Sequence, residues 1–393
     1  GIGGSTTITT DSNVTGTSAD GIYASNSTKA KDINITQSGG NITGGSNGIN
    51  AQNSGQGSIL IQSAGDITGT IGQGIIAVNQ ATAKDLTITQ SGGNILGQAS
   101  GISVQNKGIG GSTTITTDGN VTGTTTEGIT VTNQTNATDL NITQSGGNIL
   151  GKTSGINAQN GGKGSILIQT QSNVTGTTGP GVKAYNVLTS TQNLTILQNG
   201  GNIVGSTGIL SQNKGSGFTF IETDSNVTGT SADGINALHQ SSTSTKDLTV
   251  IQSGGSITGQ RAGIFNQNNG GGSTIIQTAG TVEGKLNQGI YVSNSATTQD
   301  LNITQTSGSI EGNTTGIFAV NQGSGSTTIN SAGVIKGNSA EAILVDALAN
   351  ATTTINLNAN SDVSSASGVA IKENYSNTTL TMNSGSKLAG KVL

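Results

Sequence analysis

The chain has 393 residues, of which 64 are glycine, one is proline, none is cysteine or tryptophan, and only 9% are charged. A net charge of −4 without a basic stripe argues against nucleic acid as a partner, and the absence of cysteine excludes disulfides and thiolate metal sites. No apolar run is long enough for a membrane-spanning helix. The abundance of Gly, Ser, Thr and Asn is typical of disorder, but the internal periodicity overrules that interpretation.

Two similar units of about 27 residues alternate along the chain. The first type reads "STTITTDGNVTGTTTEGITVTN" at 112–133, and the second reads "LNITQSGGNILGKTSGINAQN" at 140–160. Units of the first type begin at residues 5, 58, 112, 165, 218, 273 and 326. The opening "GIGGSTTITT" recurs at 108–117, so we expect the chain to be a piece of a longer repeat protein.

Each unit contains three short stretches in which apolar and polar residues alternate. In residues 86–106 these stretches are "LTIT", "NIL" and "GISVQ", and Gly, Ser, Asn and Asp separate such stretches in the repeat. Alternation with a period of two predicts strands, and the separating residues are typical of turns. An apolar period of the helical kind survives only near "AEAILVDALA" at 340–349.

Three strands per unit, without the tight turns of hairpins, predict an all-β fold: a three-sided, right-handed parallel β-helix solenoid of about 15 coils with about 27 residues per coil. We expect regular coils of alternating type over 1–340 and less regular coils of the same β-helix over 341–393. Stacking aligns equivalent residues into ladders about 4.8 Å apart. One inward ladder consists of Ile22, Ile49, Ile75, Ile102, Ile129, Ile156, Val182, Ile209, Ile235, Ile264, Ile290, Ile317 and Ile343. Two glycine columns, which begin with Gly16 and Gly21, are expected to serve a positive φ or a tight bend at the corners.

The only histidine of the chain stands in a column that is otherwise asparagine. The column consists of Asn26, Asn53, Asn79, Asn106, Asn133, Asn160, Asn186, Asn213, His239, Asn268, Asn294 and Asn321. Stacked asparagines are expected to hydrogen-bond along the coil axis and to satisfy turn amides. We therefore interpret His239 as a structural exception in this ladder, and not as a catalytic or metal-binding residue.

Neither catalysis nor metal binding is expected. The nucleophile pattern G-x-S-x-G occurs around Ser46, but it lies at a predicted corner, seven coils from the only histidine. A set of aspartates recurs in alternate coils, too far apart for shared calcium coordination: Asp32, Asp85, Asp139, Asp247 and Asp300. The only arginine, Arg261, has no acidic neighbour in its own coil. The sequence predicts a protein that is not an enzyme and that holds no cofactor.

The alternating "ITQSGGNI" and "TTITTDGNVTGT" units resemble the passenger domains of type V secreted bacterial autotransporters, and most closely the inducible autotransporters of Bartonella. The resemblance covers nearly the whole chain, but its motifs are structural. It implies a passenger at the bacterial cell surface or in the extracellular medium, attached to a membrane only through a C-terminal translocator barrel absent from this sequence. It also implies contact with erythrocytes or endothelial cells.

The resulting expectation is a non-enzymatic, monomeric passenger that binds a host cell-surface protein or glycan as an adhesin or receptor ligand. Two alternatives stay open. The first is a secreted pro-angiogenic ligand that stimulates endothelial growth through a host receptor. The second is a purely structural stalk, because nothing in the repeats themselves marks a binding residue.

One outward column contains the candidate partner-binding stripe. The column is polar or mixed over most of its length, but its last members are large and apolar on consecutive coils. The stripe consists of Phe265, Tyr291, Phe318 and Leu344, joined on the same face by Leu238 and Val320. It would be about 14 Å long. We interpret it as a contact for a host protein, as structural aromatic stacking, or as a surface covered by 340–393.

Overall fold

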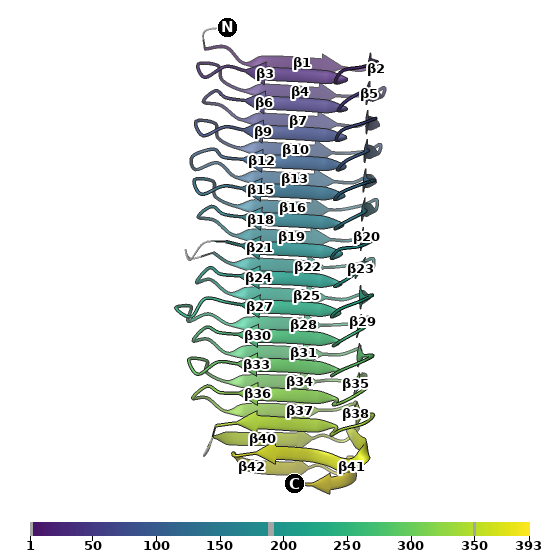
Figure 1. Cartoon of the computed structure of the whole chain (residues 1–393), viewed down its shortest axis with the longest axis vertical. Coiled ribbons are helices and arrows are strands. Elements are labelled where there is room, and N and C mark those ends of the chain that lie inside the picture. The colour runs from purple at the N-terminus through teal and green to yellow at the C-terminus, as the bar shows by residue number, and fades with distance from the viewer. Residues whose placement is uncertain (1–2, 188–191, 349–350) are drawn as a thin grey trace. The chain divides into compact units, whose positions relative to one another are not determined.

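The computed structural model describes residues 3–187, 192–348 and 351–393, and all regular elements in these ranges are β-strands (Figure 1). The chain forms a parallel β-solenoid of about 14 turns with about 27 residues per turn, which confirms the predicted β-helix. It divides into two compact units, unit 1 over 1–195 and unit 2 over 196–393. The apolar period near 340–349 corresponds to strand β39 (Ile343–Ala347), and not to a helix.

Each turn of unit 1 contributes three strands in a fixed order. The first strands are β1 (Thr6–Thr10), β4 (Ile33–Gln37), β7 (Ile59–Ser63), β10 (Leu86–Gln90), β13 (Thr113–Thr117), β16 (Leu140–Gln144) and β19 (Ile166–Thr170). The second strands are β2 (Val14–Gly16), β5 (Ile42–Gly44), β8 (Ile67–Gly69), β11 (Ile95–Gly97), β14 (Val121–Gly123), β17 (Ile149–Gly151) and β20 (Val174–Gly176). The third strands are β3 (Ile22–Asn26), β6 (Ile49–Asn53), β9 (Ile75–Asn79), β12 (Ile102–Asn106), β15 (Ile129–Asn133), β18 (Ile156–Asn160) and β21 (Val182–Asn186).

Unit 2 repeats this order, and β22 (Leu194–Gln198) spans the boundary between the units. The first strands are β25 (Thr219–Thr223), β28 (Leu248–Gln252), β31 (Thr274–Thr278), β34 (Leu301–Gln305), β37 (Thr327–Ser331), β40 (Thr352–Leu357) and β42 (Asn377–Met382). The second strands are β23 (Ile203–Gly205), β26 (Val227–Gly229), β29 (Ser256–Gly259), β32 (Thr281–Gly284), β35 (Ser309–Gly312) and β38 (Val334–Gly337). The third strands are β24 (Ile209–Asn213), β27 (Ile235–His239), β30 (Ile264–Asn268), β33 (Ile290–Asn294), β36 (Ile317–Asn321) and β39.

The C-terminal strands depart from the three-strand pattern. The long strand β41 (Asp362–Asn374) pairs with both β38 and β39, so it occupies the second and third positions of its turn. Its pairing with β43 (Lys387–Val392) contains register shifts between Ser364 and Ile371. These strands still continue the turns of unit 2.

Neighbouring turns pair in parallel and in register, so equivalent side chains lie next to each other. Ile88 pairs with Ile115 in the first strands, and Ile129 pairs with Ile156 in the third strands. All four side chains are buried, and burial alternates along each strand as the sequence pattern predicts. Stacked β-branched side chains fill the narrow interior of such a sheet well. The predicted inward ladders are therefore confirmed.

The two glycine columns are required by close packing at the corners. A Cβ at Gly44 would lie 1.7 Å from the carbonyl oxygen of Asn47, and a Cβ at Gly21 would lie 2.7 Å from Cγ2 of Ile42. The expectation of a positive φ in these columns was wrong, whereas the tight bend is confirmed. Six of the described glycines with a positive φ form a different column, in the turn after the first strand of alternate turns: Gly40, Gly93, Gly147, Gly201, Gly255 and Gly308.

The asparagine ladder is buried and closes the loops that follow the third strands. Asn53 Oδ1 accepts a hydrogen bond from the amide of Gly55 at 2.9 Å, and its Nδ2 donates to the carbonyl of Gly57 at 2.9 Å. Asn294 Nδ2 does reach Asn321 Oδ1, but only at 3.5 Å. The predicted satisfaction of turn groups is confirmed, and bonding within each loop predominates over bonding along the axis because the loop groups lie closer.

Candidate functional site

The predicted stripe exists as a continuous column on the outer face of unit 2. Strand register places Phe265 next to Tyr291, Tyr291 next to Phe318, and Phe318 next to Leu344. The rings of Phe265 and Tyr291 stack with centroids 5.0 Å apart and an interplanar angle of 20°. Phe318 meets Tyr291 edge-on, with centroids 5.4 Å apart and an angle of 77°. All four side chains are half-buried, so the column packs against itself and keeps an exposed side.

The two flanking residues of the prediction lie on the same face but do not extend the stripe. Leu238 and Val320 belong to the neighbouring outward column, where Gln267 and Ser293 separate them. The turn after Val320 places Asp346 in that column. The structure therefore brings four of the six predicted residues into one continuous contact and leaves Leu238 and Val320 apart from each other.

The head of the stripe carries a guanidinium that the sequence reasoning missed. Arg261 Nη2 lies 2.8 Å from Oδ2 of Asp233, and Arg261 Nε lies 3.3 Å from Oδ1. Asn236 Nδ2 donates to the same Oδ2 at 2.8 Å, and strand register places Asn236 next to Phe265. Arg261, Asp233 and Asn236 therefore form a polar group directly at the Phe265 end of the stripe.

The buried Asp233 carboxylate fixes the position of the exposed Arg261 guanidinium through this hydrogen-bonded ion pair. Its side chain is 1% exposed, whereas that of Arg261 is 51% exposed, and Asp233 Oδ1 also accepts from the amide of Ala262 at 3.2 Å. The hydrogen bond and the charge of Asp233 raise the pKa of Arg261 above its usual value. Two of the five guanidinium N–H groups are used by Asp233, so the exposed ones can meet a partner. The pair is not visible within one coil of the sequence, because Asp233 belongs to the coil that precedes that of Arg261.

The other end of the stripe is also charged. Strand register places Lys372 next to Leu344. Glu341 lies at the turn just before β39, and both residues are half-buried. The apolar column is thus bounded by Arg261 on one side and by a lysine with a nearby glutamate on the other.

His239 occupies the ladder position that its column predicts. It pairs in register with Asn213 and Asn268, is fully buried, and its Nδ1 lies 3.1 Å from the hydroxyl of Thr219. Its Nε2 has no hydrogen-bond partner among the described residues. Burial lowers the pKa of His239 from 6.5 to about 4, against the opposing effect of the Asp247 charge. A neutral, enclosed imidazole fits the structural interpretation of this residue.

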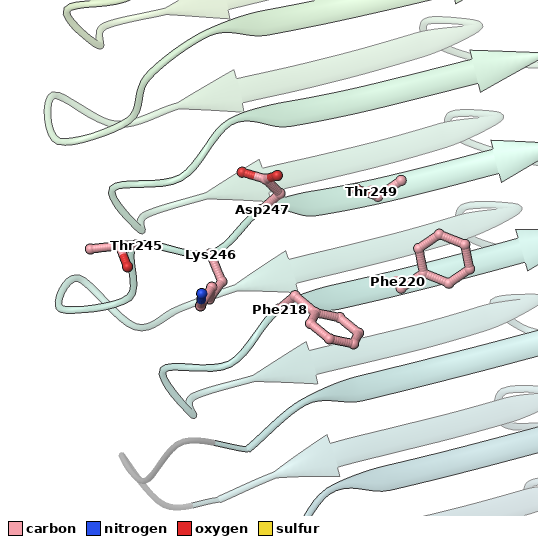
Figure 2. A pocket seen from close by; sticks show the side chains of 6 residues that line it. All are labelled: Phe218, Phe220, Thr245, Lys246, Asp247 and Thr249. Atoms are coloured by element: carbon pink, nitrogen blue, oxygen red, sulfur yellow. The ribbon is translucent and has the colours of Figure 1, made fainter.

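A hollow of about 410 Å³ lies on the first-strand sheet of unit 2, beside the loop that follows His239 (Figure 2). It is lined by Phe218, Phe220, Thr245, Lys246, Asp247 and Thr249. The two phenylalanines project side by side from one turn, and the other four residues belong to the next turn. The sequence analysis named none of these six residues as a site.

The alternate-coil aspartates cap the following turn. Asp85 Oδ1 accepts from the amide of Ser112 at 2.9 Å, and Asp139 Oδ1 accepts from that of Ser165 at 2.8 Å. Within the described ranges, no three His, Cys, Asp or Glu side chains are grouped so that they could hold a metal ion. The same ranges contain no helix of the length and apolarity needed to cross a membrane.

Comparisons with protein-family models, with curated proteins and with solved structures found no match to this chain. The stripe, the paired arginine and the hollow therefore have to be interpreted through their own chemistry.

Proposed function

We propose that the chain is a non-enzymatic autotransporter passenger at the bacterial surface or in the medium, which binds a host cell-surface protein. The observation that carries this proposal is the stripe of Phe265, Tyr291, Phe318 and Leu344 headed by Arg261. A few residues carry most of the binding energy at protein interfaces, and aromatic residues and arginine are enriched at such interfaces. This chain has only eight Phe and Tyr residues and a single arginine, and three of those aromatics and the arginine lie together here.

The geometry of the stripe favours a protein over a glycan as its partner. Phe265 and Tyr291 each use one ring face for their mutual stack, and Phe318 packs edge-on against Tyr291. A sugar ring needs a free aromatic face, whereas an apolar protein side chain can pack against ring edges and against Leu344. The exposed N–H groups of Arg261 suit a carboxylate of the same partner. The expected contact is a protein segment with large apolar side chains and an acidic residue.

Folding of the solenoid is compatible with export through a membrane. The described strands within each unit pair with their equivalents one turn away, so each turn needs only its neighbours. Such short-range contacts favour progressive folding from one end. The chain also contains no cysteine, so no disulfide could obstruct its passage in an unfolded state. These properties support the proposal without being specific to it.

The test is the binding of labelled purified protein to endothelial cells and erythrocytes. We expect Phe265→Ser and Phe318→Ser each to weaken binding roughly tenfold or more, because each removes a large apolar side chain from the stripe. Tyr23→Ser is the matched control, since Tyr23 stands in the same outward column, is 59% exposed, and has the polar Asn50 as its neighbour. That control should bind like the wild-type protein.

The contribution of Arg261 to binding can be tested with a variant that does not leave the buried Asp233 carboxylate without its partner. The double variant Asp233→Asn with Arg261→Gln removes the guanidinium and the carboxylate together, and Asn47 shows that the Asp233 column accepts asparagine. The double variant Lys336→Gln with Glu311→Gln, which removes the exposed pair of those two residues, is the charge-matched control. Weaker binding only in the first double variant supports the proposal. Full binding by the two phenylalanine variants, with lowered thermal stability, would make the stripe structural and put the partner site elsewhere on the chain. Absence of binding by the wild-type protein itself would leave the chain as a stalk.

A further inference from the structure

One turn of unit 2 departs from the repeat in several columns at once. Phe218 stands where the other first-type units have serine: Ser5, Ser58, Ser112, Ser165, Ser273 and Ser326. Phe220 stands in a column that otherwise contains smaller or aliphatic residues: Thr7, Leu60, Thr114, Leu167, Ile275 and Thr328. His239 replaces the ladder asparagine of the same turn. In a repeat protein, such coincident exceptions point to a local requirement beyond the fold.

The loop after His239 is a further exception. It covers residues 240–247 and thus has eight residues, whereas the loops after ladder asparagines that lie wholly within the described ranges have five or six. An asparagine closes a short loop through carbonyls four to six residues further on. The imidazole of His239 makes no such bond to its own loop among the described residues; its Nδ1 lies 3.1 Å from the hydroxyl of Thr219 instead.

The two phenylalanines and the long loop meet at the hollow of about 410 Å³ (Figure 2). Phe218 and Phe220 form one side, and the last residues of the long loop, Thr245 to Asp247, form the other. Phe220 pairs in register with Thr249, so the aromatic and the polar residues lie on adjacent turns. Phe218 is 39% exposed and Phe220 is half-buried, which leaves aromatic surface open to a ligand.

A second hollow, in unit 1, shows which lining residues distinguish the unit 2 hollow from the ordinary repeat. It has a volume of about 400 Å³ and is lined by Lys31, Asp32, Gln56, Gly57, Ser58 and Lys84. Ser58 and Lys84 stand in the same columns as Phe218 and Lys246. A lysine at the rim therefore belongs to the ordinary repeat, whereas the two phenylalanines occur only in the unit 2 hollow. The repeat needs no aromatic residue at this place to form its turns.

We propose that the unit 2 hollow binds a neutral saccharide residue. The C–H face of a sugar ring packs on the exposed rings of Phe218 and Phe220, and its hydroxyls meet donors and acceptors at the rim. Asp247 Oδ1 is occupied by the amide of Ser273 at 2.8 Å, and its Oδ2 accepts no hydrogen bond from any described residue. Oδ2 accepts from one sugar hydroxyl, while Lys246 Nζ and the Thr249 hydroxyl donate to others.

The two rim charges argue for a neutral ligand. Lys246 and Asp247 are adjacent and exposed, so an anionic sugar would meet the carboxylate and a cationic ligand would meet the ammonium. The volume of about 410 Å³ is within the range of small-ligand sites. The hollow lies on the first-strand sheet and the stripe lies on third strands, so the saccharide site is independent of the proposed protein contact.

The test uses saturation-transfer NMR of the whole chain with the methyl glycosides of galactose, glucose, mannose and N-acetylglucosamine, together with a printed array of neutral, sialylated and sulfated glycans. We expect binding of at least one neutral glycoside. The double variant Phe218→Ser with Phe220→Thr restores the residues of the repeat, so it should fold normally and bind at least tenfold more weakly. The control Phe265→Ser, which removes an aromatic residue from the stripe, should keep saccharide binding.

A reciprocal variant makes the test independent of a loss of folding. Ser58→Phe with Leu60→Phe transplants both rings beside Lys84 and Asp85 in unit 1. In the background of the Phe218→Ser, Phe220→Thr variant, it should restore part of the saccharide binding. The proposal is overturned if no neutral glycoside binds, if only sialylated or sulfated glycans bind, or if the restored repeat binds as well as the wild-type protein.

Discussion

The stability of the chain should fall as the pH is lowered, and His239 should account for a defined part of that fall. The imidazole is fully buried, its Nε2 has no partner among the described residues, and burial lowers its pKa from 6.5 to about 4. The unfolded chain therefore binds a proton more readily than the folded chain between these two values. The stabilising contribution is fully present above pH 6.5 and is lost as the pH falls towards 4.

The size of the effect follows from the shift. A pKa lowered from 6.5 to about 4 corresponds to about 3 kcal/mol of unfolding free energy lost across that window. His239→Asn removes the titrating group and restores the ladder residue, and Thr219 can then donate to the new amide as Thr113 donates to Asn133 at 2.6 Å. The variant should keep the fold and cell binding at neutral pH, and it should lack this part of the pH dependence.

The assay is urea unfolding of wild type and His239→Asn at several pH values between about 4 and 7, read by circular dichroism. Since turns of a solenoid can unfold separately, hydrogen exchange of the amides in β25, β27 and β28 gives a local reading. Parallel pH profiles for the two proteins would refute the buried, neutral imidazole. Loss of cell binding in the variant at unchanged melting temperature would refute its structural interpretation.

Two further stability predictions concern the core. Asn266 is fully buried with both amide atoms unpaired among the described residues, and Ala237 and Val292 are its neighbours in register, so Asn266→Val should raise the unfolding free energy by about 1–3 kcal/mol. Lower stability of that variant in urea unfolding would indicate a hidden partner for the amide. Ile149→Asp should cost several kcal/mol, because it buries an unpaired carboxylate between Val121 and Val174. Unchanged circular dichroism and protease resistance of the Ile149→Asp protein would contradict a packed core at this turn.

The period of the sequence was sufficient to predict the fold, since alignment of units alone places Ile129 beside Ile156 and His239 among asparagines. The corners were predicted less well. Whether a glycine serves a positive φ or close packing depends on the path of the neighbouring backbone, and Gly44 turned out to be the second case. The direction of the asparagine hydrogen bonds was also not readable from the columns, because the loop carbonyls that compete for Nδ2 appear only in three dimensions.

The stripe of the candidate site was predicted from the sequence, whereas the Arg261–Asp233 pair was not. Phe265 and its successors share a column, and columns are visible in one sequence. Arg261 and Asp233 lie 28 residues apart at slightly different positions in their turns, so their contact depends on how an arginine side chain crosses to the preceding turn. Phe218, in contrast, could have been found from the sequence, because it interrupts a serine column in the first-type units.

Phe218 illustrates where a binding site is expected in a regular solenoid. A column that holds the same residue in every turn mostly serves the fold. Examples are the glycine at a corner and the asparagine that closes a loop. A binding site needs something that the other turns lack, so it has to appear as an exception to a column. Exceptions that meet in space, such as Phe218, Phe220 and the loop after His239, point to a local requirement that the other turns do not have.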